Sequence, residues 1–240
     1  MRAACLQLKV EPCRKEGNLH RALTLARSAI GERAEVLAFP ELFLTGFCYE
    51  FEADAASVRS SLDPFLKLAR NHGCLIIGSI RSGRQNLGFC LDSEGFELRP
   101  KIHPFGSEKE HFDGGDFISP VATPWGMVGI EVCYDLRFPE VARALALQGA
   151  DFLITVAQFP AIRIEQWRAL CVARSIENQL PHVACNYAEG GGSLIVDASG
   201  RVQAEAGRGE AMIIGEIDLA GRDAVRRDVP CFADRRPEVY

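Results

Sequence analysis

A cysteine stands in the segment GIEVCYDLRFPE, residues 129–140, at the point where an apolar run ends and a new helix is expected. In open α/β sheets ligands bind beyond the carboxyl ends of strands, where backbone N–H groups can face a developing anion. Cys133 is therefore a candidate nucleophile, although its position suits a buried structural thiol equally well. A nucleophilic thiol also needs a nearby base or cation in order to react at neutral pH.

Charged residues near the ends of two other apolar strands are candidates for that base and cation. Glu41 closes the segment VLAFPE and is followed by LFLTGF, so its carboxylate sits among apolar residues, where an unpaired charge is costly. Lys101 lies in LRPKIHPF, and lysine is rare in this arginine-rich chain, which hints that a compact ammonium is needed there. Glu108, in GSEKEHFDGGD, is a further candidate, with Glu110 as its alternative.

Short apolar runs alternate with helical patterns along the chain. Apolar residues at the helical spacing from Leu19 to Ile30 predict a helix that Gly31 ends in a left-handed conformation. Further helices are expected at 57–71, from Pro139 onward and at 165–178, and Pro139 suits a first helical turn. Strands are expected at 3–10, 35–39, 74–80, 87–91, 96–103, 127–133, 152–157, 182–186, 193–197 and 212–217. The segment VDASGR, residues 196–201, is expected to be a turn that joins the strand at 193–197 to a further strand before 212–217. The order predicts an α/β fold with a mixed sheet covered by helices, and no linker divides residues 1–240 into more than one domain.

The composition of the chain limits the classes of molecule that it is expected to bind. With 48% apolar residues among 240, the chain can bury a sizeable core. The net charge of −5 and the scattered arginines argue against a nucleic-acid partner. No apolar run reaches the ~20 residues of a membrane span, and the N-terminus becomes charged too early for a secretory signal. We therefore expect a cytoplasmic protein with no membrane partner.

The cysteines and histidines give no indication of a metal site. Nine cysteines contain no C-x-x-C pair, and most are expected to be small buried hydrophobic residues in a reducing compartment. Five histidines show no ligand spacing, so neither a metal nor another cofactor is expected.

The segments FPELFLTGF, KIHPF and EVCYDLRFPE, in this order, resemble the three signature segments of the nitrilase superfamily of carbon–nitrogen hydrolases. The likeness spans residues 3–232 and implies a four-layer α-β-β-α sandwich. By this resemblance Glu41 is the general base, Lys101 the lysine that binds the oxyanion and Cys133 the nucleophile. Glu108 matches the second glutamate found in many members of the superfamily.

A further segment, FPAIRIEQWRALCVARSIENQ, is similar to the ω-amidase branch, whose members hydrolyse the terminal amide of 2-oxoglutaramate and 2-oxosuccinamate. This implies a small-molecule amide substrate, a thioester intermediate, and the acid and ammonia as products. The backbone N–H of Tyr134 would share the oxyanion with Lys101. Arg163 would bind the distant carboxylate of the substrate, since a forked guanidinium suits that group, or else make a surface contact.

Other functions remain open from the sequence. The same superfamily includes N-carbamoyl amino acid hydrolases and nitrilases, and a non-catalytic binding protein could keep the fold. Relatives dimerise through helices near 165–178, so a homodimer or higher homo-oligomer is expected. Asp135, Arg137 and Glu140, which flank the candidate nucleophile, are expected to form structural ion pairs.

Overall fold

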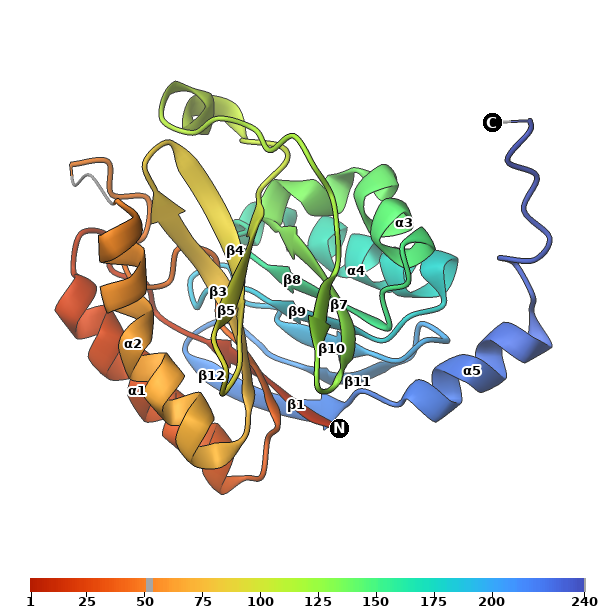
Figure 1. Cartoon of the computed structure of the whole chain (residues 1–240), viewed down its shortest axis with the longest axis horizontal. Helices are drawn as coiled ribbons and strands as arrows, with labels where there is room; N and C mark the ends of the chain where they lie inside the picture. Colours follow the sequence, from red (N-terminus) through yellow and green to blue (C-terminus); the bar gives the residue numbers. More distant parts are fainter. Residues whose placement is uncertain (51–53, 240) are drawn as a thin grey trace.

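The structure, a computed structural model, describes residues 1–50 and 54–239, and its centre is a pair of six-stranded sheets packed face to face (Figure 1). The first sheet contains, in spatial order, β12 (Ala211–Glu216), β1 (Arg2–Gln7), β2 (Val36–Ala38), β3 (Leu75–Ser82), β4 (Gln85–Leu91) and β5 (Phe96–Pro100). The second contains β11 (Val202–Glu205), β10 (Leu194–Val196), β9 (His182–Cys185), β8 (Phe152–Val156), β7 (Gly126–Val132) and β6 (Val121–Thr123).

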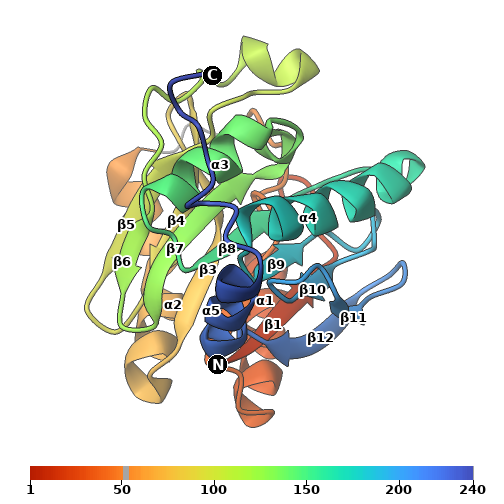
Figure 2. The ribbon, with the colours of Figure 1, turned by 90° about the vertical axis from the view of Figure 1, so that its right-hand side faces the viewer.

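Helices cover the outer face of each sheet. The first sheet is covered by α1 (Lys15–Gly31) and α2 (Ala55–His72), and the second by α3 (Pro139–Leu147) and α4 (Ile164–Asn178), as Figures 1 and 2 show. A last helix, α5 (Leu219–Asp228), follows β12 and leads toward the C-terminus. Three short 3-10 helices are η1 (Gly106–Glu110), η2 (Cys133–Arg137) and η3 (Ala161–Arg163). The expected four-layer α-β-β-α sandwich is confirmed.

The central strands are apolar on both faces because each face is covered. In β1, Ala3 and Cys5 join the core between the two sheets, whereas Ala4 and Leu6 join the core beneath α1 and α2. This alternation follows from the two-residue period of a strand. A smaller apolar cluster lies beneath α3.

Strand directions bring several strand ends to one edge of the first sheet. β2 and β3 are parallel, β4 is antiparallel to β3, and β5 is antiparallel to β4, so β5 runs in the same direction as β2. The residues that follow β2 and β5 therefore emerge at the same edge, where β4 begins. In the second sheet β7, β8 and β9 are parallel, so the ends of β7 and β8 are also adjacent.

Some element boundaries differ from the prediction. The strand expected at 127–133 ends at Val132, and Cys133 begins η2 instead. The strand expected at 96–103 ends at Pro100, because the backbone N–H groups of Ile102 and His103 turn toward the side chain of Asp135 in η2. The left-handed residue after α1 is Arg33 (φ 63°), while Gly31 remains helical, so the expected glycine cap is wrong. Strand β6 and helix α5 were not predicted.

Two of the nine cysteines form a disulfide, in contrast to the free thiols expected for a reducing compartment. Cys13 and Cys48 are joined across a sequence separation of 35 residues, with Cα atoms 5.2 Å apart. Of the seven free cysteines, six are buried and Cys231 is exposed, which confirms that most serve as small hydrophobic residues. Among the described residues one set of metal-ligand side chains gathers, Cys13, Cys48 and Glu50, but its two sulfur atoms are bonded to each other. None of the helices in the described ranges is both long enough and apolar enough to span a membrane.

Candidate active site

Glu41 is held at the end of β2 by a short, well-anchored turn. The N–H of Phe39 donates to the carbonyl of Ile77 at 2.8 Å, which continues the pairing with β3 by one residue. Leu42 adopts a left-handed conformation (φ 45°), and its N–H donates to Ser79 Oγ at 2.8 Å. The turn carries the completely buried carboxylate of Glu41 to the edge where β5 also ends.

Lys101 joins two carboxylates that lie far apart in the sequence. Its Nζ donates to Glu41 Oε1 and to Glu108 Oε2, each at 2.7 Å. Glu108 reaches this position because η1 folds back over the end of β5, where the N–H of Phe112 donates to the Glu108 carbonyl. All three charged side chains are buried, so each charge needs the partners that this cluster supplies.

Two uncharged residues, which were not predicted, complete the surroundings of Glu41. Asn86, the second residue of β4, donates from Nδ2 to Glu41 Oε1 at 2.8 Å. Gln158, which follows β8, donates from its backbone N–H to Glu41 Oε2 at 3.2 Å and from Nε2 to the Glu41 carbonyl at 2.8 Å. The bonds from Gln158 show that the strand ends of the two sheets meet at Glu41.

Cys133 faces the same charged cluster from the second sheet. It begins η2 directly after β7 and has a φ of 51°, a conformation that is unfavourable for a residue with a Cβ and is often found at functional sites. Its thiol lies close enough to Glu41, Lys101 and Glu108 for their charges to shift its pKa, and the backbone N–H of Gln158 lies near it. The structure therefore brings the four sequence-predicted catalytic residues together.

Burial and charge set the protonation of these groups. Burial, followed by repulsion from Glu41, raises the pKa of the Cys133 thiol well above its usual value. Burial opposes the charge on Lys101, but attraction to Glu41 and the other anionic groups outweighs it and raises the pKa of that ammonium. Burial and the nearby Glu41 charge also raise the pKa of Glu108. At neutral pH the site holds an ammonium ion and a protonated thiol, so the thiol needs a base to become nucleophilic.

The side chain of Asp135 connects the turn that contains Cys133 to the segment after Lys101 through hydrogen bonds. Its buried carboxylate accepts hydrogen bonds from the backbone N–H groups of Ile102, His103 and Val132 at 3.2, 2.9 and 3.3 Å. His103 Nδ1 lies 2.9 Å from Asp135 Oδ1 as well. The expected ion pairing of the flanking residues is therefore partly wrong. Asp135 bonds mainly to backbone, while Arg137 donates to the uncharged Gln166.

Tyr134 and Arg163, the two predicted substrate-binding residues, both contact the ring of Phe105. The ring of Tyr134 contacts Phe105 with centroids 4.7 Å apart, and the Arg163 guanidinium lies 5.8 Å from the centroid of Phe105. Arg163 is exposed, and no carboxylate in the described part of the chain pairs with it. A guanidinium in this setting can bind an anionic group that enters from solvent.

Glu110, the alternative to Glu108, lies outside the buried charged cluster. Glu110 is exposed, and its carbonyl accepts a hydrogen bond from Arg84, whereas Glu108 points inward to Lys101. Glu140 is exposed in the first turn of α3, away from the buried cluster.

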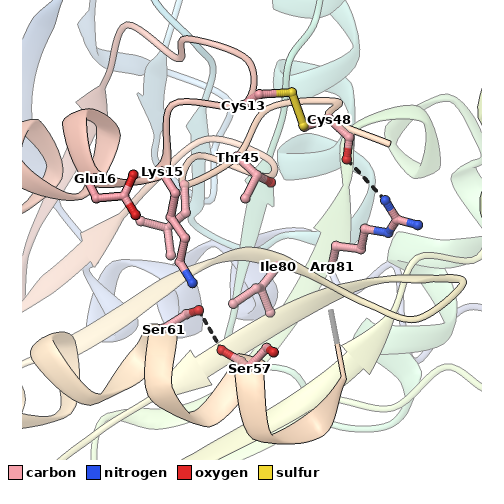
Figure 3. Close-up of a pocket in the computed structure, with 10 residues that line it drawn as sticks. Cys13, Lys15, Glu16, Thr45, Cys48, Ser57, Ser61, Ile80 and Arg81 are labelled. Carbon is pink, nitrogen blue, oxygen red and sulfur yellow. Dashed lines mark hydrogen bonds between the residues drawn. A yellow bond between two sulfur atoms is a disulfide. The ribbon is translucent and has the colours of Figure 1, made fainter. Parts of the chain in front are cut away.

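A cavity of about 270 Å³ lies beside the Cys13–Cys48 disulfide, between the first turns of α1 and α2. Figure 3 shows the disulfide on one side and Ser57 and Ser61 of α2 on the other, with the Lys15 side chain extending between them. The residues that line this cavity include none of the four predicted catalytic residues, so it is distinct from the cluster around Glu41.

Comparisons with known proteins show which family this chain belongs to. The sequence model of the family described as carbon-nitrogen hydrolase matches residues 2–227. The chain belongs to the carbon-nitrogen hydrolase family. It is 33% identical over 259 aligned residues to the 2-oxoglutaramate amidase of Bacillus subtilis (strain 168), covering 99% of this chain and 98% of that protein. These findings confirm the expected superfamily and an amidase-type enzyme.

Solved structures of carbon-nitrogen hydrolases share the fold. The crystal structure of Saccharomyces cerevisiae Nit3, a member of branch 10 of the nitrilase superfamily, matches with a TM-score of 0.89 and 27% identity, over 98% of this chain and 96% of that one. A mutant of the amidase from Nesterenkonia sp. AN1 matches with a TM-score of 0.82 and 25% identity, over 95% of this chain and 99% of that one. In that structure acrylamide has added to the active-site cysteine, which supports a cysteine nucleophile in the family.

Proposed function

We propose that the protein hydrolyses the terminal amide of a small carboxylated amide of the 2-oxoglutaramate type, with Cys133 as its nucleophile. The observation that carries this proposal is the buried contact of Lys101 with both Glu41 and Glu108, beside the Cys133 thiol. The likeness to a 2-oxoglutaramate amidase over nearly the whole chain supports the choice of substrate.

In the first half of the reaction Glu41 removes the proton from Cys133 as the sulfur attacks the amide carbonyl. The carbonyl oxygen becomes an oxyanion, which Lys101 and the backbone N–H of Tyr134 stabilise, because the first N–H groups of η2 have no partner within that helix. Glu41 then gives the proton to the departing nitrogen. The C–N bond breaks, ammonia leaves, and a thioester remains on Cys133.

Water completes the cycle by attacking the thioester. Glu41 accepts a proton from this water and returns it to the sulfur, so that the acid is released and the thiol is restored. Glu108, bonded to the opposite side of Lys101, orients the amide and the water. Removal of an oxyanion donor typically costs about 3 kcal/mol of barrier, so Lys101→Ala should lower kcat by about 100-fold or more.

Arg163 supplies the specificity in this scheme. Its exposed guanidinium lies over the ring of Phe105, which in turn contacts Tyr134. From this position it can bind the distant carboxylate of the substrate. Arg163→Ala should raise KM mainly for acidic substrates and leave kcat for neutral amides almost unchanged.

The test is ammonia release from 2-oxoglutaramate, glutamine, an N-carbamoyl amino acid and a simple nitrile, with Cys133→Ala as the control. Release from 2-oxoglutaramate alone, abolished in the variant, is the expected result. Release with carbon dioxide from the carbamoyl compound, or release from the nitrile, would assign the enzyme to another reaction of the family. A Cys133 that alkylates no faster than the other buried thiols, in a protein inactive on all four compounds, would favour a binding protein.

We also propose a cytoplasmic enzyme, with residues 1–240 as one hydrolase domain, that forms a homodimer or larger homo-oligomer. Exposed apolar side chains on the α3 and α4 side, Leu147 and Ile176, support such an assembly. Sedimentation of the purified protein at micromolar concentration gives the oligomeric state directly, and a monomer would contradict this part of the proposal.

A further inference from the structure

The two carboxylate oxygens of Glu41 have unequal surroundings. Oε1 accepts hydrogen bonds from Lys101 Nζ at 2.7 Å and from Asn86 Nδ2 at 2.8 Å. Oε2 accepts one hydrogen bond from the described residues, from the backbone N–H of Gln158 at the longer distance of 3.2 Å. A carboxylate oxygen has two lone-pair directions, so Oε1 is fully occupied while Oε2 keeps one direction available.

Cys133 lies beside this carboxylate, close enough for the charge on Glu41 to raise the pKa of its thiol. The N–H of Gln158 that donates to Oε2 also lies near the Cys133 thiol, so the carboxylate and the thiol lie next to one backbone group. Oε2 is therefore the oxygen of Glu41 that can accept a proton without disturbing the bonds at Oε1. Oε1 is therefore held by two hydrogen bonds, whereas Oε2 is able to take part in proton transfer.

Asn86 is placed to maintain this separation. It begins β4 at the edge where β2 and β5 end, and its backbone carbonyl accepts the N–H of Lys101 at 2.9 Å. One residue thus holds the side chain of Glu41 and the backbone of Lys101. Since an amide donor carries no charge, it orients the carboxylate without the additional positive charge that would weaken it as a base.

The amide oxygen of Asn86, Oδ1, also supports this interpretation. Asn86 is 1% exposed, and its Oδ1 is buried with no hydrogen-bond partner among the described residues. An unpaired buried amide oxygen is unfavourable for stability, and a small apolar residue would avoid it. Reversing the amide would place Oδ1 against a carboxylate oxygen, so contact with Glu41 fixes its orientation.

We propose that Asn86 is a positioning residue for amide hydrolysis, which saturates Glu41 Oε1 and thereby reserves Oε2 for proton transfer with Cys133. This rests on the proposed role of Glu41 as the base. Asn86 donates to Glu41 and not to the reacting atoms, so its loss should change kcat and the pH profile more than KM.

The experiment compares Asn86→Ala and the isosteric Asn86→Asp with the wild-type protein. A hydrogen bond to a charged group is worth about 10- to 100-fold in an equilibrium or rate, and we expect kcat for the amide substrate to fall by that factor in Asn86→Ala, with KM nearly unchanged. In both variants the acidic limb of the kcat/KM profile should move to higher pH. The shift should be larger in Asn86→Asp, where a second carboxylate faces Oε1.

Asn178→Ala is the matched control. Asn178 is equally buried, donates from Nδ2 to the Arg174 carbonyl, and also has an Oδ1 without a partner, but it lies at the end of α4. Its replacement should lower the melting temperature and leave the pH profile in place. Wild-type values of kcat and an unshifted acidic limb in both Asn86 variants would overturn the proposal, as would a shift of equal size in Asn178→Ala.

A second measurement separates this inference from the proposed function. The pH dependence of Cys133 alkylation by iodoacetamide, followed by mass spectrometry of the peptide, reports the Glu41–Cys133 pair without an amide substrate. If the protein releases ammonia from none of the amides, the proposed function fails, yet a shifted alkylation profile in Asn86→Asp still supports the role of Asn86. An alkylation profile identical to wild type in that variant refutes it.

Discussion

Glu131 and His182 lie on either side of Thr155 in the core beneath α4, and their effects on stability should largely cancel as the pH changes. All three side chains are completely buried. Thr155 Oγ1 lies 3.1 Å from Glu131 Oε2 and 2.7 Å from His182 Nε2. His182 Nδ1 lies 3.0 Å from the carbonyl oxygen of Cys171.

When Glu131 and His182 are both neutral, one placement of the hydrogens satisfies these three contacts. The Cys171 carbonyl can only accept, so His182 carries its proton on Nδ1, and its Nε2 accepts the hydroxyl hydrogen of Thr155. The Thr155 oxygen must then accept a hydrogen from Glu131, which requires a protonated carboxyl. Burial raises the pKa of Glu131 to about 7 and lowers the pKa of His182 to about 4, so both groups are neutral in the folded protein at mildly acidic pH.

The two pKa shifts act on stability with opposite signs. The raised pKa of Glu131 favours folding at low pH, and this stabilisation is lost as the pH rises from 4.5 to about 7. The lowered pKa of His182 favours folding above pH 6.5, and this stabilisation is lost as the pH falls to about 4. At 1.36 kcal/mol per pH unit, each contribution is about 3 kcal/mol, so the wild-type protein should show little net slope from this pair.

Replacing one partner should expose the contribution of the other. Glu131→Gln keeps a donor for Thr155, and its free energy of unfolding should rise by about 3 kcal/mol relative to wild type between pH 4.5 and 7. His182→Asn should show the opposite slope between pH 4 and 6.5. Urea unfolding followed by circular dichroism at closely spaced pH values measures both, with the exposed Glu140→Gln as the control. If both variants keep the wild-type pH dependence, the proton placement is wrong.

Three further changes test the site and its support. Reducing the Cys13–Cys48 disulfide, or replacing both cysteines with serine, should lower the free energy of unfolding by about 4 kcal/mol, as expected for a cross-link spanning 35 residues, and identical urea midpoints with and without reductant would contradict this. Asp135→Asn loses acceptors for backbone N–H groups, so kcat/KM should fall by about 100-fold with a lower melting temperature, and unchanged steady-state kinetics would exclude a positioning role. Glu108→Gln should lower kcat while Lys101 stays bound to Glu41, and full activity would remove Glu108 from the mechanism.

Residue type and strand position made Glu41, Lys101 and Cys133 candidates for the site, and the resemblance to the nitrilase superfamily joined them into one set. Glu41, Lys101 and Cys133 each follow an apolar strand, and strands that share a direction deliver their last residues to one edge. The resemblance to the nitrilase superfamily supplied their roles, which stay predictions until tested. The choice of Glu108 over Glu110 could not be made from the charge pattern, because it depends on how η1 turns over the end of β5.

The uncharged partners could not be predicted, because their contacts cross between strands and sheets. Asn86 and Gln158 are 45 and 117 residues away from Glu41 in the sequence, and no local period encodes such pairings. A polar residue at the start or just past the end of an apolar strand is the one signal that both share. The disulfide has no spacing rule either, since it depends on the return of the chain after Glu41 to the segment before α1.

Charge balance explains why the site combines a protonated thiol with an ammonium that stays charged. With both carboxylates ionised, Glu41, Glu108 and Lys101 together carry one net negative charge, and a free thiolate at Cys133 would add a second in a buried space. In the proposed mechanism, transfer of the thiol proton to Glu41 during attack avoids that state, because one anion disappears as the oxyanion forms. Lys101 cannot take the proton, since the raised pKa of its ammonium keeps it charged. The cluster therefore favours attack coupled to proton transfer over a resting thiolate.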